Sequence, residues 1–491
     1  MDEGIDRTIE DDAESTGPLT TRERIHEVFE SDRAFGFFQY VVLLNLIFLF
    51  TKPQVLMPVL AATKFPIVLF LLSFVLMLTR LRAIWTFPVK MMSAFLILHA
   101  GFIFYGKVID DDFIVNDFQA YDAWQTLLQI FGCFLFPVMA FCGGPRGAKR
   151  LVKVMLYSGL FLGVYVLLNN GRGPGDFVGD ENDVCVVLVT LLPLPLMLLQ
   201  SRSTAGTTRK SFLLIVLLCL LGGIVQTRSR GGFIGLVAVI LSCAWLSPRK
   251  WQLFAVFGAV LLFAAPFVPA DYWAEIRSIS DTETGTALKR RQMWEAAFRA
   301  WLDFPNAITG VGIDNIPWRI GEYEGPEAGV IRASYAGRQV HSLGIQILAD
   351  LGLIGIFMIG WLVVRSIRDG RALLTDVRIA RTELNAARPV DHPNESSTLD
   401  ESPSADEFGL DLGTREKIVN ELNWLEGTLL AGNLMWLGHF AAGFFVSVLY
   451  YPTLWFLSVF AACIQSYTTT LRDSMEEFLD VVDNEHETRA L

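Results

Sequence analysis

Charged and chemically reactive side chains are scarce in this chain. Only 19% of its 491 residues are charged, and it has six cysteines and six histidines. The cysteines show neither metal-ligand nor disulfide-framework spacing, so we expect small core residues and no metal site. A nucleotide-binding glycine loop, a Cys-x-x-Cys motif and a basic, aromatic-rich surface are missing too. These absences argue against an ATP-driven pump, a nucleotide-sugar donor and a nucleic-acid partner.

Long apolar runs are what the chain has instead. Hydrophobic residues make up 52% of it, and runs such as 211–225 and 232–246 are uninterrupted. A membrane-spanning helix needs roughly 20 mostly apolar residues. We therefore predict an all-α polytopic membrane protein with about 12 transmembrane helices and one large extracytoplasmic loop containing amphipathic helices. The expected spans are 34–51, 55–79, 91–106, 121–142, 148–168, 183–200, 211–226, 231–247, 251–269, 343–364, 427–449 and 452–470.

The net charge of −11 comes from acidic residues gathered in the tails and one insert. We expect solvated, disordered segments there, over 2–14, 391–411 and 473–487, so that the insert is only partly disordered. The polar first thirty or so residues suggest that the first span directs insertion, without a cleaved signal. The predicted organisation is a cytoplasmic tail 1–33, a bundle of about nine spans 34–269, an extracytoplasmic loop 270–342, a span 343–364, a cytoplasmic insert 365–426, two spans 427–470 and an acidic cytoplasmic tail 471–491.

Lysine and arginine in short loops predict the sidedness, because these residues resist translocation. Alternate loops are basic, and the loops between them are acidic or neutral. The rule therefore predicts that both termini are cytoplasmic. The residues that mark the cytoplasmic side are Arg80, Arg82, Lys90, Arg146, Lys149, Arg150, Lys153, Arg202, Arg209, Lys210, Arg249, Lys250, Arg365, Arg368, Arg371, Arg378 and Arg381.

The turn Thr227-Arg228-Ser229-Arg230-Gly231-Gly232 departs from this rule, because it puts two arginines on the outer side. Two guanidinium groups beside glycines that let the backbone approach a ligand can hold a diphosphate through charge-assisted, bidentate hydrogen bonds. The alternative is that Arg228 and Arg230 extend to lipid head groups at a helix end. From the residues alone, the two interpretations carry equal weight.

His341 precedes the span 343–364 and is predicted to lie on the same outer side as the two arginines. A histidine at a helix start is more often a structural hydrogen-bonding residue than a catalytic one. Next to an anion site, however, a neutral imidazole could take the proton of an acceptor hydroxyl while the arginines stabilise a departing diphosphate.

Further candidate residues lie in the outer loops. Lys289, Arg290 and Arg291 begin an apolar stripe at helical spacing, typical of an amphipathic helix whose basic start could join a phosphate site. Asp314 and Asn315 form a turn that is structural or contacts an acceptor. A group of two acidic residues and one asparagine begins the span 183–200, and it either caps that helix or orients a sugar or the arginines. It consists of Asp180, Asn182 and Asp183.

Several of these motifs together resemble the superfamily of O-antigen ligases and O-antigen polymerases, over roughly residues 175–360. The resemblance is carried by Gly179-Asp180-Glu181-Asn182-Asp183, by the turn 227–232, by Arg291 to Trp294 and by Gly310-Val311-Gly312. The most specific stretch begins at His341 and runs through Ala349-Asp350-Leu351-Gly352-Leu353-Ile354-Gly355.

The resemblance implies a metal-independent, cofactor-free glycosyltransferase of the bacterial inner membrane with an extracytoplasmic active site. Its donor would be an undecaprenyl-diphosphate-linked glycan, bound at the diphosphate by Arg228 or Arg230 and by Arg291. His341 would activate the acceptor hydroxyl. Asp180, Asn182, Asp183, Asp314 and Asn315 are candidate glycan or acceptor contacts. The acceptor stays open among lipid A core, a growing polysaccharide and a protein, as do the sugar and the oligomeric state.

Two alternatives belong to other functional classes. A transporter or flippase for a lipid-linked or anionic solute would be expected to show internal repeats and broken midplane helices, and we see no convincing repeat. A structural subunit of an envelope assembly could use the insert to recruit cytosolic partners. The polar candidate residues gather at the outer interface, which favours the transferase.

Overall fold

Helices form all the regular secondary structure in the part of the chain that the computed structural model describes. The described residues are 27–30, 33–110, 112–201, 207–247, 250–252, 254–255, 258, 285–323, 335–386 and 412–490. The main helices are α2 (Gly36–Thr51), α5 (Phe65–Leu78), α7 (Phe87–Val108), α8 (Asp117–Gln129), α9 (Phe136–Cys142), α10 (Pro145–Leu168), α11 (Glu181–Leu191), α12 (Pro193–Gln200), α13 (Thr207–Gln226), α14 (Arg230–Leu246), α17 (Gly285–Leu302), α20 (Leu343–Ala386), α21 (Leu412–Gly443) and α22 (Pro452–Ala490).

These helices confirm an all-helical protein that crosses the membrane several times. Eight of them, counting continuous pairs such as α8–α9 and α11–α12 once, are long and apolar enough to span, and α5 and α14 are shorter apolar helices. The expected total of about 12 is not confirmed. Most of the expected ninth span, 251–269, lies outside the described residues.

Prolines divide the second expected span, because a proline has no backbone N–H for the hydrogen bonds of a helix interior. Two short helices, α3 (Pro53–Leu56) and α4 (Pro58–Ala62), each begin at a proline, and Pro66 lies in the first turn of α5. A proline is tolerated in a first helical turn because the N–H there has no partner within the helix. The region is therefore a broken hairpin before α5.

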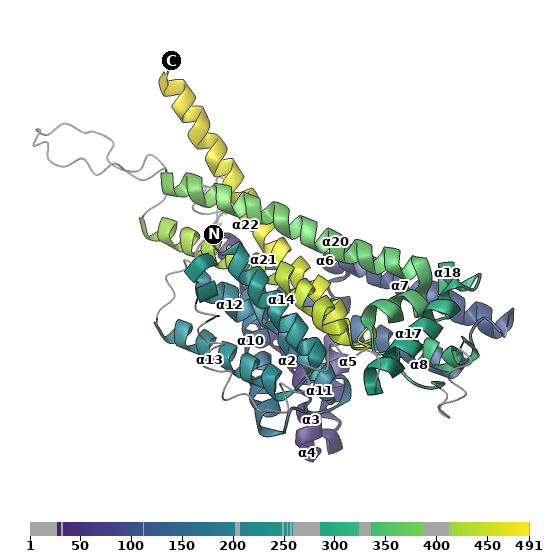
Figure 1. Cartoon of the computed structure of the whole chain (residues 1–491). Helices are drawn as coiled ribbons and strands as arrows, with labels where there is room; N and C mark the ends of the chain where they lie inside the picture. Colours follow the sequence, from purple (N-terminus) through teal and green to yellow (C-terminus); the bar gives the residue numbers. More distant parts are fainter. Residues whose placement is uncertain are drawn as a thin grey trace, which may run out of the picture.

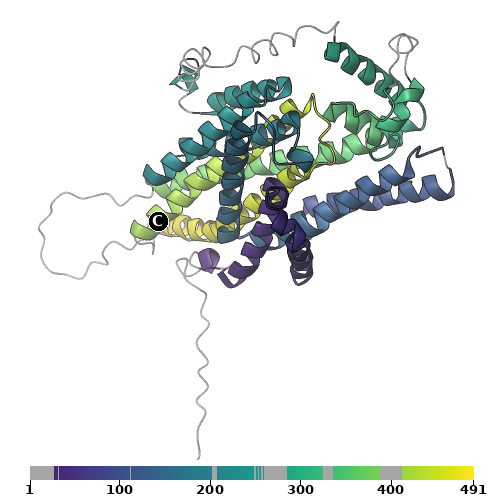
Figure 2. The same ribbon diagram turned by 90° about the horizontal axis from the view of Figure 1, so that it is seen from below.

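Helix α21 lies at the centre of the bundle and packs on α11, α12, α14, α20 and α22 (Figure 1). Small residues on α21 permit this close approach. A Cβ atom added to Gly438 would lie 2.9 Å from a methyl of Val239 and 3.0 Å from the Val189 carbonyl oxygen. Helices α7 and α8 pack together and extend away from the bundle (Figure 2).

The basic loops gather at one end of the bundle, where they pair with acidic or polar partners. Arg146 bonds Glu30 at 2.5 Å, and Lys149 bonds Glu421 at 2.7 Å. Arg80 donates to the Ala140 carbonyl at 3.0 Å. Loops far apart in the sequence thus share what we call the basic end.

Residues with a strained backbone conformation lie mainly at the opposite end of the bundle. Except for Lys64, which falls within the expected span 55–79, every non-glycine residue with a positive φ in the described ranges lies in a loop that the charge pattern assigns to this other end. Such conformations cost free energy, and they cluster where surrounding structure fixes a functional loop. The residues are Lys52, Lys64, Asn170, Asp176, Arg228, Asp314 and His341.

Two helices continue beyond the apolar runs that predicted them. The expected disordered segments 2–14 and 391–411 lie outside the described residues. Helix α20 continues 22 residues past the expected span end at 364 to Ala386, and α21 begins at Leu412, so both flanks of the insert 365–426 are helical. Helix α22 continues to Ala490, which corrects our expectation of disorder for the C-terminal acidic tail. Both extensions contain many residues of high helix propensity, such as alanine, leucine, glutamate and arginine.

A break in α20 joins this helix to the loop before it. Gly352 has φ 61° and ψ −158°, a conformation that essentially only glycine adopts. Beside it, the N–H groups of Val311 and Gly312 donate to the carbonyls of Ala349 and Asp350, at 2.9 and 3.1 Å. A Cβ atom on Gly352 would lie 2.5 Å from the backbone nitrogen of Gly310. The loop therefore docks directly on the helix backbone.

We expect Gly352→Ala to lower the free energy of unfolding by roughly 2–4 kcal/mol, since it adds both backbone strain and overpacking. Gly360→Ala is the matched control, because nothing lies within 4 Å of a Cβ atom at that position of the same helix. Thermal unfolding of the purified variants measures the difference. Equal midpoints for the two variants would refute this account of the break.

Candidate functional site

The arginine-bearing turn owes its shape to the residues around the two guanidinium groups. Thr227 Oγ1 donates to the Ile224 carbonyl at 2.7 Å, and Ser229 Oγ accepts the Gly232 N–H at 3.2 Å, which caps the start of α14. Arg228, with φ 53°, occupies the corner and is exposed. The side chain of Arg230 is partly exposed.

The two glycines of this turn serve helix packing. A Cβ atom on Gly232 would lie 2.1 Å from Cys185 Sγ on α11, and one on Gly231 would lie 2.8 Å from the Ala442 carbonyl oxygen on α21. The proposal that they also let a ligand approach the backbone stays a prediction. They let three helices meet beneath the arginines.

Asp180 and Asp183 hold the start of α11 at the same end of the molecule. Asp180 is the helix cap, since its carboxylate accepts the backbone N–H and the side-chain amide of Asn182, at 2.9 and 3.1 Å. Asp183 accepts a hydrogen bond from the Tyr451 hydroxyl at 3.1 Å. The capping role predicted as one alternative is thus present, and Asp180 remains exposed.

Hydrogen bonds on both sides of His341 fix its backbone. Its φ is 49°, a left-handed conformation in which histidine is enriched among non-glycine residues. The preceding Val340 carbonyl accepts the indole N–H of Trp294 at 2.7 Å, so α17 fixes the chain just before the histidine. A neighbouring cap, Ser342 Oγ, accepts the Ile345 N–H at 3.4 Å and begins α20.

Two charges from distant segments act on the imidazole of His341. Its pKa is lowered below the ordinary value of 6.5, first by loss of surrounding water and then by the positive charge of Arg290. The negative charge of Asp180 opposes that shift. Although His341 retains exposed surface, the ring is thus favoured in its neutral, proton-accepting form.

Arg290 is the site residue that our sequence interpretation did not select. We chose Arg291, but Arg291 pairs with Glu295 at 3.2 Å, one helical turn further on, and both side chains are about half exposed. Arg290 precedes Trp294 by four residues and therefore shares its helix face. Because Trp294 contacts the backbone beside His341, this spacing was the signal that could have found Arg290.

Aromatic rings connect the arginine turn to the histidine. The ring of Phe445, next to the end of α21, lies against Gly231, and its centroid is 6.3 Å from that of Trp294. Trp294 in turn bonds Val340. Segments near 180, 230, 290, 341 and 445 therefore form one neighbourhood, in which the backbone of the arginine turn connects through these two rings to the backbone before His341.

Asp314 and Asn315 belong to a buried polar network beneath this neighbourhood. Asp314 accepts from Gln119 and Gln339, at 2.5 and 3.1 Å, and burial raises its pKa. The Tyr450 hydroxyl accepts the Asp314 N–H at 2.8 Å and donates to Asp350 at 2.9 Å.

The network leaves Asp314 and Asn315 little surface for a glycan, since their exposed fractions are 7% and 0%. We therefore regard both as scaffold. Across the described segments, no three His, Cys, Asp or Glu side chains are arranged as metal ligands.

Tyr450→Phe should destabilise the protein more than Tyr451→Phe. The first change leaves the Asp314 N–H and Asp350 without their shared hydroxyl in a buried place, at a cost of about 1–3 kcal/mol for each unsatisfied group. The second removes a single bond to Asp183. Thermal unfolding of both variants tests the order, and a reversed order would show that this network is not structural.

Comparison with known proteins finds a similarity to one family. Residues 215–360 match the family model described as O-antigen ligase. The match includes the arginine turn, α17 and His341, whereas Asp180 and Tyr450 lie outside it. No curated protein matches the chain. The match confirms the resemblance seen in the sequence motifs and does not favour the transporter alternative.

Proposed function

We propose that this membrane protein, whose residues 215–360 match the O-antigen ligase family, transfers a glycan from an undecaprenyl-diphosphate-linked donor to an acceptor hydroxyl. The reaction would take place at the end opposite the basic loops, which the positive-inside rule assigns to the outer side of a bacterial inner membrane. Both termini would then lie in the cytoplasm. The acceptor classes are lipid A core, a growing polysaccharide and a protein.

The observation that carries the proposal is the environment of His341. A basic residue from α17 and the acidic cap of α11 both act on this imidazole, although about 50 and 160 positions separate them from it in the chain. The backbone on which the ring stands is strained and anchored. A fixed, neutral imidazole beside cationic groups suits the removal of a proton next to a departing anion.

The proposed step is a direct displacement. The acceptor hydroxyl oxygen attacks the anomeric carbon of the donor sugar while His341 takes the hydroxyl proton. A new carbon–oxygen bond forms as the bond from the anomeric carbon to the phosphate oxygen breaks. The diphosphate leaves with that electron pair on its oxygen, and the imidazolium later returns its proton to water or to the diphosphate.

Arginines would stabilise the charge that builds on the leaving diphosphate. A guanidinium forms two parallel hydrogen bonds to phosphate oxygens, which the point charge of a lysine does not. Arg290 is the arginine whose charge lowers the pKa of His341. Arg228, Arg230 and Arg291 are further diphosphate-binding candidates, and the exposed corner position of Arg228 supports its inclusion. Asp180, Asn182 and Asp183 are proposed to face the glycan or acceptor.

We expect His341→Ala and His341→Asn to abolish glycan transfer while the folded protein is retained. Asparagine tolerates the left-handed backbone of this position but cannot accept the proton, so it separates base chemistry from backbone strain. The assay reconstitutes the purified protein with a polyprenyl-diphosphate glycan and candidate acceptors. Transfer by His341→Asn at the parent rate would show that His341 is not the base.

The transfer rate should rise with pH through the pKa of His341, which lies below 6.5, because only neutral imidazole accepts a proton. Arg290→Gln removes a charge that lowers this pKa, so the acidic limb of kcat/KM should move to higher pH. Asp180→Asn removes a charge that raises the pKa and keeps a capping residue, so the limb should move to lower pH.

Profiles of kcat/KM against pH for the parent and the two variants measure these shifts. Because the variants remove opposite charges, a general loss of activity cannot imitate the expected pair of displacements. Displacement in the same direction, or none in either variant, would contradict the assignment.

A further inference from the structure

A cavity of about 910 Å³ opens between α14, α20 and α21, away from the neighbourhood of His341. Its walls are mainly apolar and include Trp245, Leu246, Val363, Leu437 and Phe440. Several of these side chains are exposed, Trp245 at 69% and Leu246 at 46%. The volume falls within the range of small-molecule sites, roughly 300–1,000 Å³.

The cavity is elongated along the helices. It is lined from Val363 to Arg378 on α20 and from Leu430 to Phe440 on α21, which at 1.5 Å per residue corresponds to about 22 and 15 Å. One leaflet contributes about half of a hydrocarbon core roughly 30 Å thick. The length therefore suits the acyl chains of one leaflet.

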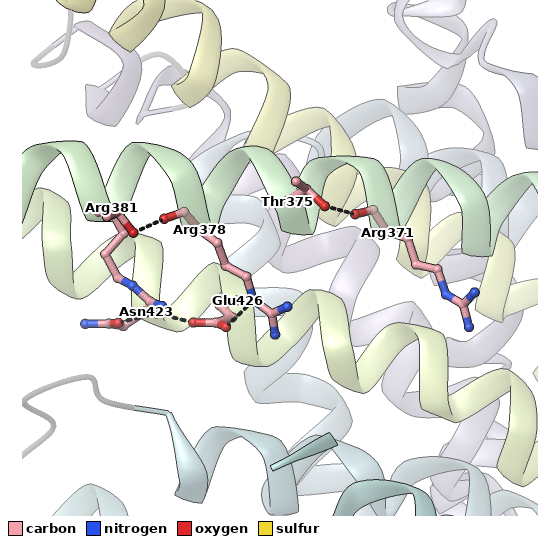
Figure 3. Close-up of polar contacts among 7 residues, drawn as sticks. Arg371, Thr375, Arg378, Arg381, Asn423 and Glu426 are labelled. Carbon is pink, nitrogen blue, oxygen red and sulfur yellow. Dashed lines mark hydrogen bonds and ion pairs between the residues drawn. The ribbon is translucent and has the colours of Figure 1, made fainter. Parts of the chain in front are cut away.

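Cationic side chains lie at one end of this groove, on the side of the basic loops. Arg378 pairs with Glu426 at 2.7 Å, and Arg381 bonds Asn423 at 3.1 Å as well as Glu426. Arg371 differs from these two: its guanidinium projects from α20 toward the groove, away from their shared carboxylate (Figure 3). Within the described part of the chain, no carboxylate forms an ion pair with Arg371.

A second cation supports an amphiphilic occupant. Lys250 Nζ lies 5.2 Å from the ring centroid of Trp245, one of the residues that line the groove, which places this ammonium group beside the groove.

We propose that this groove binds an anionic phospholipid of the leaflet at the basic end. The acyl chains lie between α14 and α21, and the phosphate is held by Arg371 with Lys250 nearby. Basic pockets between transmembrane helices on the cytoplasmic side commonly receive anionic head groups. The head group would lie far along α20 from His341, so the site is distinct from the proposed donor site.

The test uses the full-length protein purified in detergent with phosphatidylglycerol or phosphatidylcholine of identical acyl chains. Native mass spectrometry measures retention of each lipid. Arg371→Gln should lower the preference for phosphatidylglycerol about fivefold, the effect of one cation near a membrane surface. Arg368→Gln is the matched control, because Arg368 lies on the same helix, is 69% exposed and does not line the groove.

A second variant separates the groove from surface charge. Ser242→Trp places a bulky side chain in the cavity without changing charge and should displace both lipids. Phosphatidylglycerol carrying a photoreactive acyl chain should crosslink to α14 and α21 in the parent. Equal losses for Arg371→Gln and Arg368→Gln, undiminished binding to Ser242→Trp, or crosslinks confined to other helices would each overturn the proposal.

Discussion

The backbone contact between Gly310 and Gly352 is the constraint on which the end opposite the basic loops depends. Because neither residue has a Cβ atom, the loop 310–312 reaches the broken turn of α20 and gives its N–H groups to the carbonyls of Ala349 and Asp350. The same docking brings Asp314 to Tyr450 and Asp350. The position of His341, nine residues before Asp350, follows from this joint and from the bond of Trp294 to Val340. The candidate site therefore rests on backbone geometry.

Much of the fold was predictable because lipid imposes a simple requirement. Spans must be apolar over a fixed length, and α2, α7, α10, α13 and α22 all fall where the apolar runs predicted them. The broken hairpin followed from Pro53, Pro58 and Pro66. The continuation of α20 to Ala386 did not, because hydropathy shows where an apolar run ends and not where a helix ends. Arg365 and Asp369, paired at 3.0 Å one turn apart, continue that helix beyond the apolar part.

The site was predictable at the level of motifs and less so at the level of partners. His341, Asp180 and the arginine turn were named from sequence, and the structure gathers their segments. The selection of Arg291 over Arg290 depended on helix phase, which a run of three basic residues does not reveal. The buried role of Asp314 depends on Tyr450 and Gln119, and that of Asn315 on Asn116, each more than 130 positions away. Such long-range partners leave no local pattern in the chain.

The contacts of the segment between α21 and α22 have a consequence for biosynthesis. Phe445 lies against the arginine turn, Tyr451 bonds Asp183, and Tyr450 closes the buried network, so the final hairpin completes a neighbourhood begun by α11. Chains emerge from the ribosome N-terminus first. A nascent chain that has inserted α20 but not α22 would contain the arginines and the histidine but would lack the contacts of Phe445, Tyr450 and Tyr451. The neighbourhood of His341 would therefore be complete only after the last pair of helices has inserted.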